Sequence, residues 1–240
     1  MMNQVKRFNV EMLAENVLSV DFSKKPFTIK GEKTETTAKA VIIATGAEAN
    51  WLGLPNEQRL RGHGVSACAT CDGFFFRGKE IVVIGGGDSA MEEANFLTKF
   101  ASKVYLIHRK AEFKASKIML KRAEENPKIE FLTPYQVIDV LGDTNVTGIK
   151  MKNTESGEEK ELAVSGMFLA IGHTPVSKIF KDSGIATNEV GYIKVENHTR
   201  TNIPGVFMAG DVGDSRYRQA VTAAGLGCMA ALDAEKYLSE

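Results

Sequence analysis

Two cysteines separated by two residues, Cys68 and Cys71 in the stretch SACATCDGFFF, are the side chains of this sequence best suited to do chemistry. Such a pair can be a redox-active disulfide, half of a zinc site, or two thiols that pack in a core. A zinc site usually needs four ligands, and only Cys228 and 4 scattered histidines remain, so we expect no metal site. The choice between the other two interpretations depends on what the chain places beside the pair.

A strand, a turn and a helix are predicted after the cysteine pair, in KEIVVIGGGDSAMEEANFLTKF at residues 79–100. The β-branched residues predict the strand, and Ala90, Ala94 and Leu97 share one face of an amphipathic helix. A second strand is predicted at 102–110. Strand, helix and strand in this order form a βαβ unit, which indicates a parallel sheet with a right-handed crossover.

The turn of this unit has the spacing of a dinucleotide-binding site. Gly85, Gly87 and Ala90 match G-x-G-x-x-G/A, in which the glycines permit a tight turn and the approach of a pyrophosphate. The small third residue lets the helix pack on the strand. We expect a phosphate at the helix N-terminus, and the alternative is a strand–helix turn that is merely tight. A nicotinamide site beside the cysteines favours the redox interpretation of the pair.

A cluster of basic residues follows the second strand, in HRKAEFK with His108, Arg109, Lys110 and Lys114. An NAD site wants a carboxylate here for the ribose 2′-hydroxyl, whereas cations suit a 2′-phosphate. The cluster lies about twenty residues past the glycines, where the residue that recognises the ribose belongs. We therefore expect NADPH, and the alternative is a solvated charged loop.

Composition bounds the partners of the protein. The 240 residues include 30 basic and 30 acidic side chains, so no global field draws the chain onto nucleic acid or an acidic membrane surface. No apolar run reaches the length of a membrane span, and the first residues lack the apolar core of a secretory signal. We expect a cytoplasmic protein with no nucleic-acid or membrane partner.

The chain also contains two units that end alike. The second runs from the glycine turn through a predicted helix and a small antiparallel meander to an apolar strand. Its predicted helix is at 115–126, its meander strands at 129–133, 136–141 and 146–152, and its last strand at 166–175. The first unit has a similar meander and last strand but no opening βαβ, and its predicted segments are 17–22, 26–30 and 38–47.

Four motifs in this order, CATCDG, GGGDSAMEEA, HRK with FK, and AGDV with YRQA, make the chain resemble the bacterial-type low-molecular-weight thioredoxin reductases over essentially all of its residues. That family has an α/β fold with two Rossmann-like domains, one for FAD and one for NADPH. The resemblance implies that 1–48 and 174–240 form the FAD domain and 49–173 the NADPH domain, with hinges near 51–57 and 172–177. The FAD domain is expected to be incomplete at its N-terminus, because the usual FAD-binding βαβ segment has no counterpart here.

The resemblance also implies the reaction, which is the NADPH-dependent reduction of the thioredoxin disulfide through FAD and a Cys68–Cys71 redox pair. In this family Cys68 is the interchange thiol, Cys71 faces the flavin, and Asp72 is the acid. The alternative for Asp72 is an Asx-type turn with Gly73. A homodimer is expected. The competing hypothesis is a non-catalytic fragment that binds NADPH or senses redox state.

Two sets of cofactor-binding residues follow from the resemblance. For NADPH they are Gly85, Gly87, Asp88, Ser89, Ala90, His108, Arg109, Lys110 and Lys114. For FAD they are Thr45, Gly46, Asp211, Arg218, Gln219 and Ala220, the last three at the start of a long helix. Two further expectations concern packing. Phe74, Phe75 and Phe76 are expected to form a core stripe, and the alternative is that they line the partner surface or the flavin pocket. Cys228 is expected to be buried among small helix residues.

Overall fold

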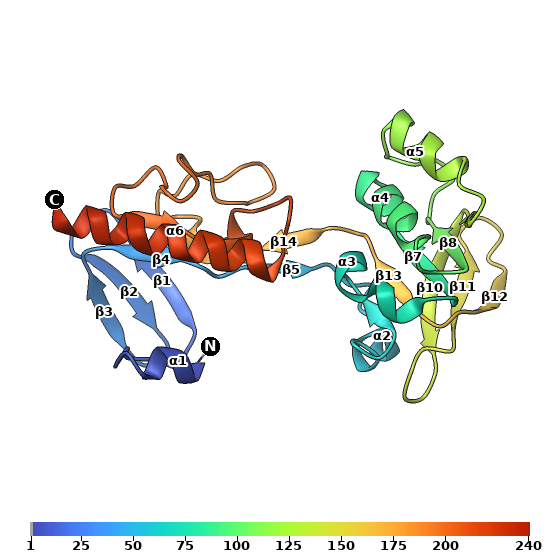
Figure 1. Ribbon diagram of the computed structural model, residues 1–240, viewed down its shortest axis with the longest axis horizontal. Coiled ribbons are helices and arrows are strands. Elements are labelled where there is room, and N and C mark those ends of the chain that lie inside the picture. The colour runs from blue at the N-terminus through green and yellow to red at the C-terminus, as the bar shows by residue number, and fades with distance from the viewer. Residues whose placement is uncertain (1) are drawn as a thin grey trace. The chain divides into compact units, whose positions relative to one another are not determined.

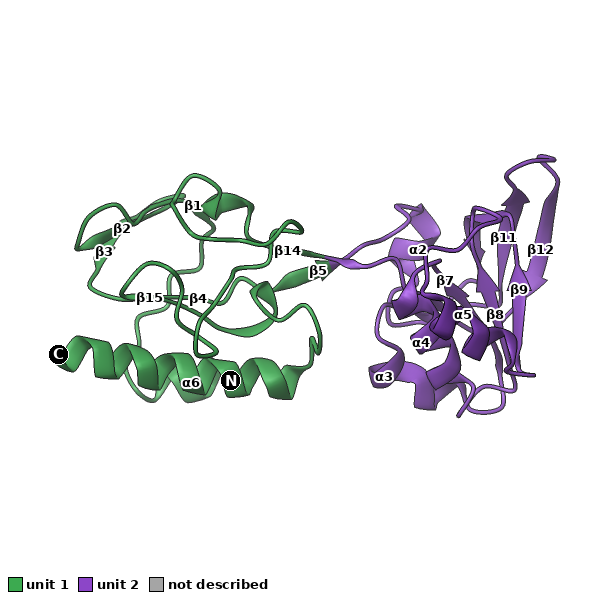
Figure 2. Cartoon of the chain, turned by 90° about the horizontal axis from the view of Figure 1, so that it is seen from above, with its two compact units in different colours: residues 1–48, 174–240 green, residues 49–173 purple. Residues whose placement is uncertain are grey.

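The computed structural model describes residues 2–240 and divides the chain into two compact units (Figure 2). Unit 1 comprises Met1–Glu48 and Thr174–Glu240, and unit 2 comprises Ala49–His173. Unit 2 is therefore inserted in the sequence of unit 1, and the chain passes between the units twice. The assignment of FAD and NADPH to these units stays a prediction at this point.

Five parallel strands form the central sheet of unit 2, in the order β6-β13-β7-β8-β9. In that order they span Val65–Ser66, Met167–Leu169, Glu80–Ile84, Lys103–Ile107 and Ile129–Leu132. The predicted βαβ unit is confirmed as β7, α4 (Asp88–Leu97) and β8. The prediction of a meander strand at 129–133 is wrong, because β9 pairs in parallel with β8. The reason is that α5 (Lys117–Glu124) is a crossover helix between β8 and β9. It returns the chain so that β9 runs beside β8 in the same direction.

The parallel sheet of unit 2 has an apolar layer on each face. Side chains alternate along a strand, so Ile81 and Val83 of β7 join the cluster with α4, whereas Val82 and Ile84 join the cluster with β10 and β11. Figure 1 shows the helices α4 and α5 and the antiparallel strands on different sides of this sheet. Burial on both faces explains why the four residues of β7 after Glu80 are an uninterrupted apolar run. The buried face of α4 contains the predicted residues and one more, namely Ala90, Met91, Ala94 and Leu97.

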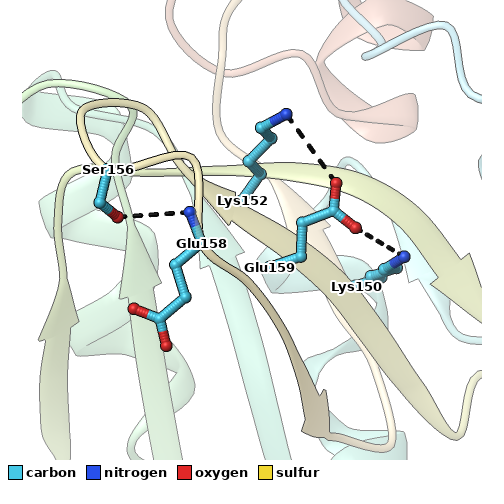
Figure 3. A network of polar contacts seen from close by, with 5 residues as sticks. All are labelled: Lys150, Lys152, Ser156, Glu158 and Glu159. Atoms are coloured by element: carbon cyan, nitrogen blue, oxygen red, sulfur yellow. Dashed lines mark hydrogen bonds and ion pairs between the residues drawn. The ribbon is translucent and has the colours of Figure 1, made fainter.

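The second layer of unit 2 is an antiparallel sheet of β10 (Tyr135–Leu141), β11 (Gly148–Asn153) and β12 (Glu159–Ala163). The predicted strands at 136–141 and 146–152 are confirmed, and β12 is an addition. The β11–β12 hairpin carries an exposed network of ions, in which Glu159 contacts two lysines (Figure 3). Exposed pairs of this kind contribute little to stability. The distance from Glu159 Oε2 to Lys150 Nζ is 2.7 Å, and the distance from Glu159 Oε1 to Lys152 Nζ is 3.9 Å. In a separate hydrogen bond, the N–H of Glu158 donates to Ser156 Oγ at 3.3 Å.

A buried carboxylate holds the first loop of unit 2. Glu57 lies in the short helix α2 (Pro55–Arg59), and its side chain is 0% exposed. Its oxygens accept hydrogen bonds from the backbone N–H groups of Leu52 at 2.9 Å, Gly53 at 2.8 Å and Leu54 at 3.3 Å. The last of these is the bond that a glutamate at the third helical position makes back to the N-cap backbone, here that of Leu54. Three backbone donors satisfy a charge that burial would otherwise make costly.

The three consecutive phenylalanines do not form a core stripe. They belong to the 3-10 helix η1 (Gly73–Phe76), in which three residues complete a turn and neighbouring side chains diverge. Phe76 is buried and meets Phe168 edge to face at 5.1 Å. Phe74 and Phe75 are 60% and 69% exposed. The expectation that all three are core residues is therefore wrong for two of them.

Unit 1 contains small sheets and one long helix. The predicted strands at 17–22 and 26–30 are confirmed, and the strand at 38–47 is shorter than expected. The antiparallel sheet consists of β1 (Val17–Asp21), β2 (Phe27–Gly31) and β3 (Glu35–Ala38). The remaining elements are α1 (Met2–Lys6), β4 (Val41–Ile43), η2 (Lys178–Phe180), β15 (Val206–Met208), η3 (Gly210–Val212) and α6 (Ala220–Ser239). Two short strands, β5 (Ala47–Ala49) and β14 (His173–Pro175), each include one residue of unit 2, at the two points where the chain passes between the units. β15 pairs in parallel with β4, and β14 pairs with β5.

The long helix α6 buries one face only. Ala230 and Ala234 are buried, and Leu226 packs against the same cluster one turn earlier. Cys228 is exposed, so the expectation that it is buried is wrong. Cys228 is two positions from both Leu226 and Ala230, so it lies about 200° around the helix from each of them and faces away from the cluster. Although α6 has 20 residues, neither it nor any other helix within residues 2–240 is long and apolar enough to cross a membrane.

Candidate functional site

The two cysteines of the C-x-x-C motif form a disulfide in unit 2, with 5.3 Å between their Cα atoms. Cys68 is the N-cap of the short helix α3 (Ala69–Asp72), and the N–H of Cys71 donates to Cys68 Sγ at 3.2 Å. Such a donor stabilises negative charge on the Cys68 sulfur when the bond is reduced. Cys68 is half-buried and Cys71 is exposed. Exposure alone therefore favours Cys71 over Cys68 as the thiol that a partner reaches first.

Asp72 is joined to the cysteine turn through Ser66. The Ser66 hydroxyl donates to Asp72 Oδ2 at 2.6 Å, and the N–H of Cys68 donates to Ser66 Oγ at 3.0 Å. Ser66 is buried and lies on β6 at the edge of the parallel sheet, which holds it firmly. Our sequence reasoning missed Ser66, although a serine two residues before the cysteine is a signal for this local bond.

A cavity of about 450 Å³ opens beside Asp72 and is also lined by Ser66, His63 and Lys79. It lies within unit 2 and leaves the Asp72 carboxylate accessible from one side. Water can therefore reach the carboxyl group of Asp72. The geometry therefore suits the expected role of Asp72 as an acid beside the disulfide.

The three consecutive glycines of the turn after β7 are needed for three different reasons. A Cβ on Gly85 would lie 2.7 Å from the Ala90 Cβ, so this glycine lets α4 pack on the sheet. A Cβ on Gly86 would lie 2.5 Å from His108 Nδ1. A Cβ on Gly87 would meet nothing within 4 Å in the described chain, so the backbone here is open to a ligand. Our sequence reasoning missed Gly86, although it is the middle residue of the GGG run.

A cavity of about 600 Å³ lies over this turn, within the size range of cofactor sites. Gly87 is the N-cap of α4, so an anion bound in the cavity would meet the free N–H groups at the start of this helix. The cavity brings together eight of the nine residues predicted for NADPH: Gly85, Gly87, Asp88, Ser89, His108, Arg109, Lys110 and Lys114. The ninth, Ala90, is 0% exposed and acts in packing beneath Gly85. An open glycine backbone, a helix start and three cations fit a phosphorylated dinucleotide.

His108 is a half-buried side chain next to the three exposed cations of this group. Its ring stacks on Phe113 with 5.2 Å between centroids, and its Nε2 atom has no hydrogen-bond partner within the described chain. Burial lowers the pKa of His108, and the neighbouring cations Arg109, Lys110 and Lys114 lower it further, against a backbone hydrogen bond at Glu112. His108 is therefore neutral near pH 7, and Nε2 is left for a ligand.

The lowered pKa of His108 predicts a loss of stability at mildly acidic pH. The unfolded chain binds this proton at a pH near 6.5, whereas the folded chain binds it only at lower pH. Stability therefore falls as the pH drops through about 6.5, the pKa of the unfolded histidine, toward the lower pKa of the folded one. We expect His108→Gln to show a smaller fall than the wild type, measured as the urea midpoint of Trp51 fluorescence. An equal fall in both proteins would contradict this assignment.

The residues predicted for FAD meet at one edge of unit 1. Since β4 and β15 are parallel, Thr45 and Gly46 after β4 lie at the same edge as Asp211 after β15. The N–H of Ala209 donates to the carbonyl of Ile43 at 2.8 Å and continues this pairing. The Thr45 hydroxyl donates to the carbonyl of Val176 at 2.6 Å, so its side chain already serves the fold.

Asp211 is the polar group at this edge that a ligand would satisfy. Its Oδ1 atom is buried and has no hydrogen-bond partner among residues 2–240. Burial raises the pKa of Asp211, and nearby Asp214 raises it further, while Arg218 opposes both. A buried acceptor of this kind fits a hydroxyl donor such as those of the flavin side chain.

The turn from Asp214 to the start of α6 presents the other predicted FAD residues. Burial alone would raise the pKa of Asp214, but hydrogen bonds from the backbone of Tyr217, Arg216 and Arg218 outweigh it and lower the pKa. Arg218 has a positive φ of 48°, and Gln219 is the N-cap of α6. Ala220 is the first residue of α6 and is exposed, at a helix start whose dipole favours electron-rich groups.

Comparisons with known proteins agree with these observations. The family model described as pyridine nucleotide-disulphide oxidoreductase matches residues 3–227. A thioredoxin reductase of Mycolicibacterium smegmatis is 51% identical over 242 residues, which cover 100% of this chain and 77% of that protein. A bifunctional thioredoxin reductase/thioredoxin of Mycobacterium leprae (strain TN) is 52% identical over 244 residues, and the match covers 100% of this chain and 53% of that protein.

Solved structures show the same likeness. The thioredoxin reductase from Streptococcus pyogenes MGAS5005 has a TM-score of 0.94 and 39% identity, over 99% of this chain and 78% of that one. The thioredoxin reductase from Giardia duodenalis has a TM-score of 0.93 and 43% identity, over 100% of this chain and 79% of that one. The predicted class of α/β fold with Rossmann-like domains is thereby confirmed.

Proposed function

The chain belongs to the thioredoxin reductases of the pyridine nucleotide-disulphide oxidoreductase family, and from this premise we propose which residues carry each part of the reaction. The reaction is the NADPH-dependent reduction of the thioredoxin disulfide through FAD and the Cys68–Cys71 pair. One observation carries the assignment: the disulfide lies in the same compact unit as the cavity with the glycine turn and the basic cluster. When bound, NADPH supplies a hydride and FAD converts it to an electron pair for sulfur.

Unit 2 is assigned as the NADPH domain. The open backbone at Gly87 and the start of α4 support binding of the pyrophosphate. The cations Arg109, Lys110 and Lys114 support binding of the 2′-phosphate, because charged donors hold a phosphate strongly. Unit 1 is assigned as the FAD domain, with the unpartnered oxygen of Asp211 as its best-supported contact.

Disulfide exchange is assigned to the two thiols of the reduced pair. The Cys68 thiolate attacks one sulfur of the thioredoxin disulfide, that bond breaks, and a mixed disulfide forms. Asp72 donates a proton to the thiolate that leaves. Cys71 then attacks Cys68 Sγ, which releases thioredoxin as a dithiol and restores the Cys68–Cys71 disulfide. The hydrogen bond from the Cys71 N–H to Cys68 Sγ supports Cys68 as the attacking thiolate, despite the greater exposure of Cys71.

Two further assignments are supported by the family alone, a cytoplasmic location and a homodimer. Sedimentation of the purified protein tests the second. The overall proposal is tested by adding FAD, NADPH and oxidised thioredoxin to the purified chain. Thioredoxin thiols should appear as NADPH is consumed. NADPH binding without thiol formation would instead support the alternative of a non-catalytic NADPH-binding or redox-sensing protein.

Neutral replacements in the basic cluster should weaken NADPH selectively. We expect Arg109→Gln with Lys110→Gln to raise the Kd for NADPH roughly a hundredfold, because two charge-assisted bonds to the 2′-phosphate are lost. The Kd for NADH should change less than about threefold, since NADH lacks this phosphate. Lys121→Gln with Arg122→Gln, on α5, removes the same charge as a control. Equal weakening of both coenzymes would contradict the 2′-phosphate assignment.

A further inference from the structure

Backbone hydrogen bonds attach the basic cluster to the glycine turn. We define the basic loop as residues 109–116, which follow β8 and contain the three cations of the cavity. The N–H of Lys114 donates to the carbonyl of Gly86 at 2.8 Å, and the N–H of Ala115 donates to the same carbonyl at 3.1 Å. The N–H of Ser116 donates to Asp88 Oδ1 at 2.6 Å. Three consecutive amides of the loop are thus bound to the turn that should receive the pyrophosphate.

Asp88 is the only side chain among the acceptors of these three bonds. Its contact is the shortest of the three, as expected when the acceptor is a carboxylate. The start of the loop is held by a hydrogen bond from the Thr154 hydroxyl to the carbonyl of Arg109 at 3.0 Å. The middle is held by packing, since Phe113 stacks on His108 at 5.2 Å and meets Phe131 edge to face at 5.4 Å. The end of the loop that carries Lys114 is therefore held by the Gly86 carbonyl and by one side chain, that of Asp88.

The charge of Asp88 argues against a direct role in binding a phosphate. A carboxylate in the first turn of α4 would repel an anion that occupies the same helix start. Held by Ser116, its oxygen instead contributes to the position of the cations. The two parts of the site are about twenty residues apart in sequence, and this bond joins them.

We propose that Asp88 is a positioning residue that holds the basic loop in place, and so sets the preference for a 2′-phosphorylated coenzyme, rather than a ligand of the coenzyme. This inference rests on the proposed NADPH site. It predicts that loss of the Asp88 oxygen weakens recognition of the 2′-phosphate and leaves recognition of the rest of the dinucleotide nearly unchanged.

Equilibrium binding of NADP⁺ and NAD⁺ tests the proposal, because these ligands differ only by the 2′-phosphate. For Asp88→Ala we expect the Kd for NADP⁺ to rise roughly tenfold, as for the loss of one hydrogen bond to a charged group. The Kd for NAD⁺ should change less than about twofold. Asp88→Asn is the matched control: it removes the charge and keeps an oxygen acceptor, so it should restore the preference for NADP⁺. Calorimetry of the protein as purified gives both constants without turnover.

A second pair of variants removes the other partner of the bond. Ser116 has a φ of −60°, which proline also adopts, so Ser116→Pro removes the N–H while the φ angle is kept. Ser116→Ala keeps the N–H and removes only the hydroxyl that caps α5. The preference for NADP⁺ should fall in Ser116→Pro and persist in Ser116→Ala. Hydrogen exchange should also show the Ser116 amide less protected in Asp88→Ala than in the wild type.

Three outcomes would overturn the proposal. Equal weakening of NADP⁺ and NAD⁺ in Asp88→Ala would make Asp88 a ligand or a support of the whole turn. An unchanged preference in both Asp88→Ala and Ser116→Pro would show that the Gly86 carbonyl suffices to hold the loop. A wild-type protein without any preference for NADP⁺ would overturn the NADPH assignment itself, and the wild-type measurement distinguishes this case from the other two.

Discussion

Cys68→Ser should lose at least about a thousandfold of thioredoxin-reducing activity, while its affinity for NADPH stays within about twofold of the wild type. The serine hydroxyl cannot form the mixed disulfide, so the covalent route to thioredoxin is closed. The NADPH cavity contains neither cysteine of the pair. The measurement is NADPH consumption with oxidised thioredoxin, together with a binding titration. Cys228→Ser is the control, because Cys228 is an exposed cysteine on α6.

The order of the two thiols can be tested with the same variants. Prereduced Cys71→Ser should form a mixed disulfide with oxidised thioredoxin that persists, because no second thiol resolves it. Prereduced Cys68→Ser should form much less of it. Denaturing gels without reductant show the adduct, and a reductant should remove it. An adduct that forms only with Cys68→Ser would assign the attacking role to Cys71, the more exposed sulfur.

Glu57→Ala should destabilise unit 2 by about 3 kcal/mol or more. The substitution leaves the N–H groups of Leu52, Gly53 and Leu54 without their acceptor in a place where the carboxylate is 0% exposed. Each buried donor left unsatisfied costs about 1 to 3 kcal/mol, and relaxation of the loop recovers part of the total.

The measurement is urea unfolding followed by the fluorescence of Trp51. This residue is the only tryptophan of the chain, and it lies in unit 2 under the guanidinium of Arg61, 3.7 Å from the ring centroid. Its signal therefore reports unit 2 rather than the whole chain. Glu159→Ala removes a carboxylate that holds two exposed ion pairs (Figure 3), and it should shift the urea midpoint far less than Glu57→Ala does. Similar effects of the two substitutions would contradict the role of Glu57.

Local sequence determined the parts of the site whose residues are neighbours in the chain. The C-x-x-C pair closes a single helical turn, so its spacing alone brings the two sulfurs together. The glycines between β7 and α4 act in the turn that they form, because they have no side chain that would block its backbone. The apolar face of α4 follows from the helical spacing of apolar residues in its sequence. The basic loop was identified for the same reason, because its distance from the glycines in a βαβ unit is nearly constant.

Only the tertiary structure decided which distant groups share hydrogen bonds and which faces are covered. The direction of β9 depended on α5 acting as a crossover, and a short apolar strand has the same pattern in a parallel and in an antiparallel sheet. The exposure of Phe75 and Cys228 depended on where neighbouring elements pack, which their own segments do not encode. The bond between Asp88 and Ser116 joins residues 28 positions apart, and no local pattern specifies such a pair. Spacing along the chain determines chemistry within one turn or one strand, whereas contacts between elements exist only once the sheet and its two layers have assembled.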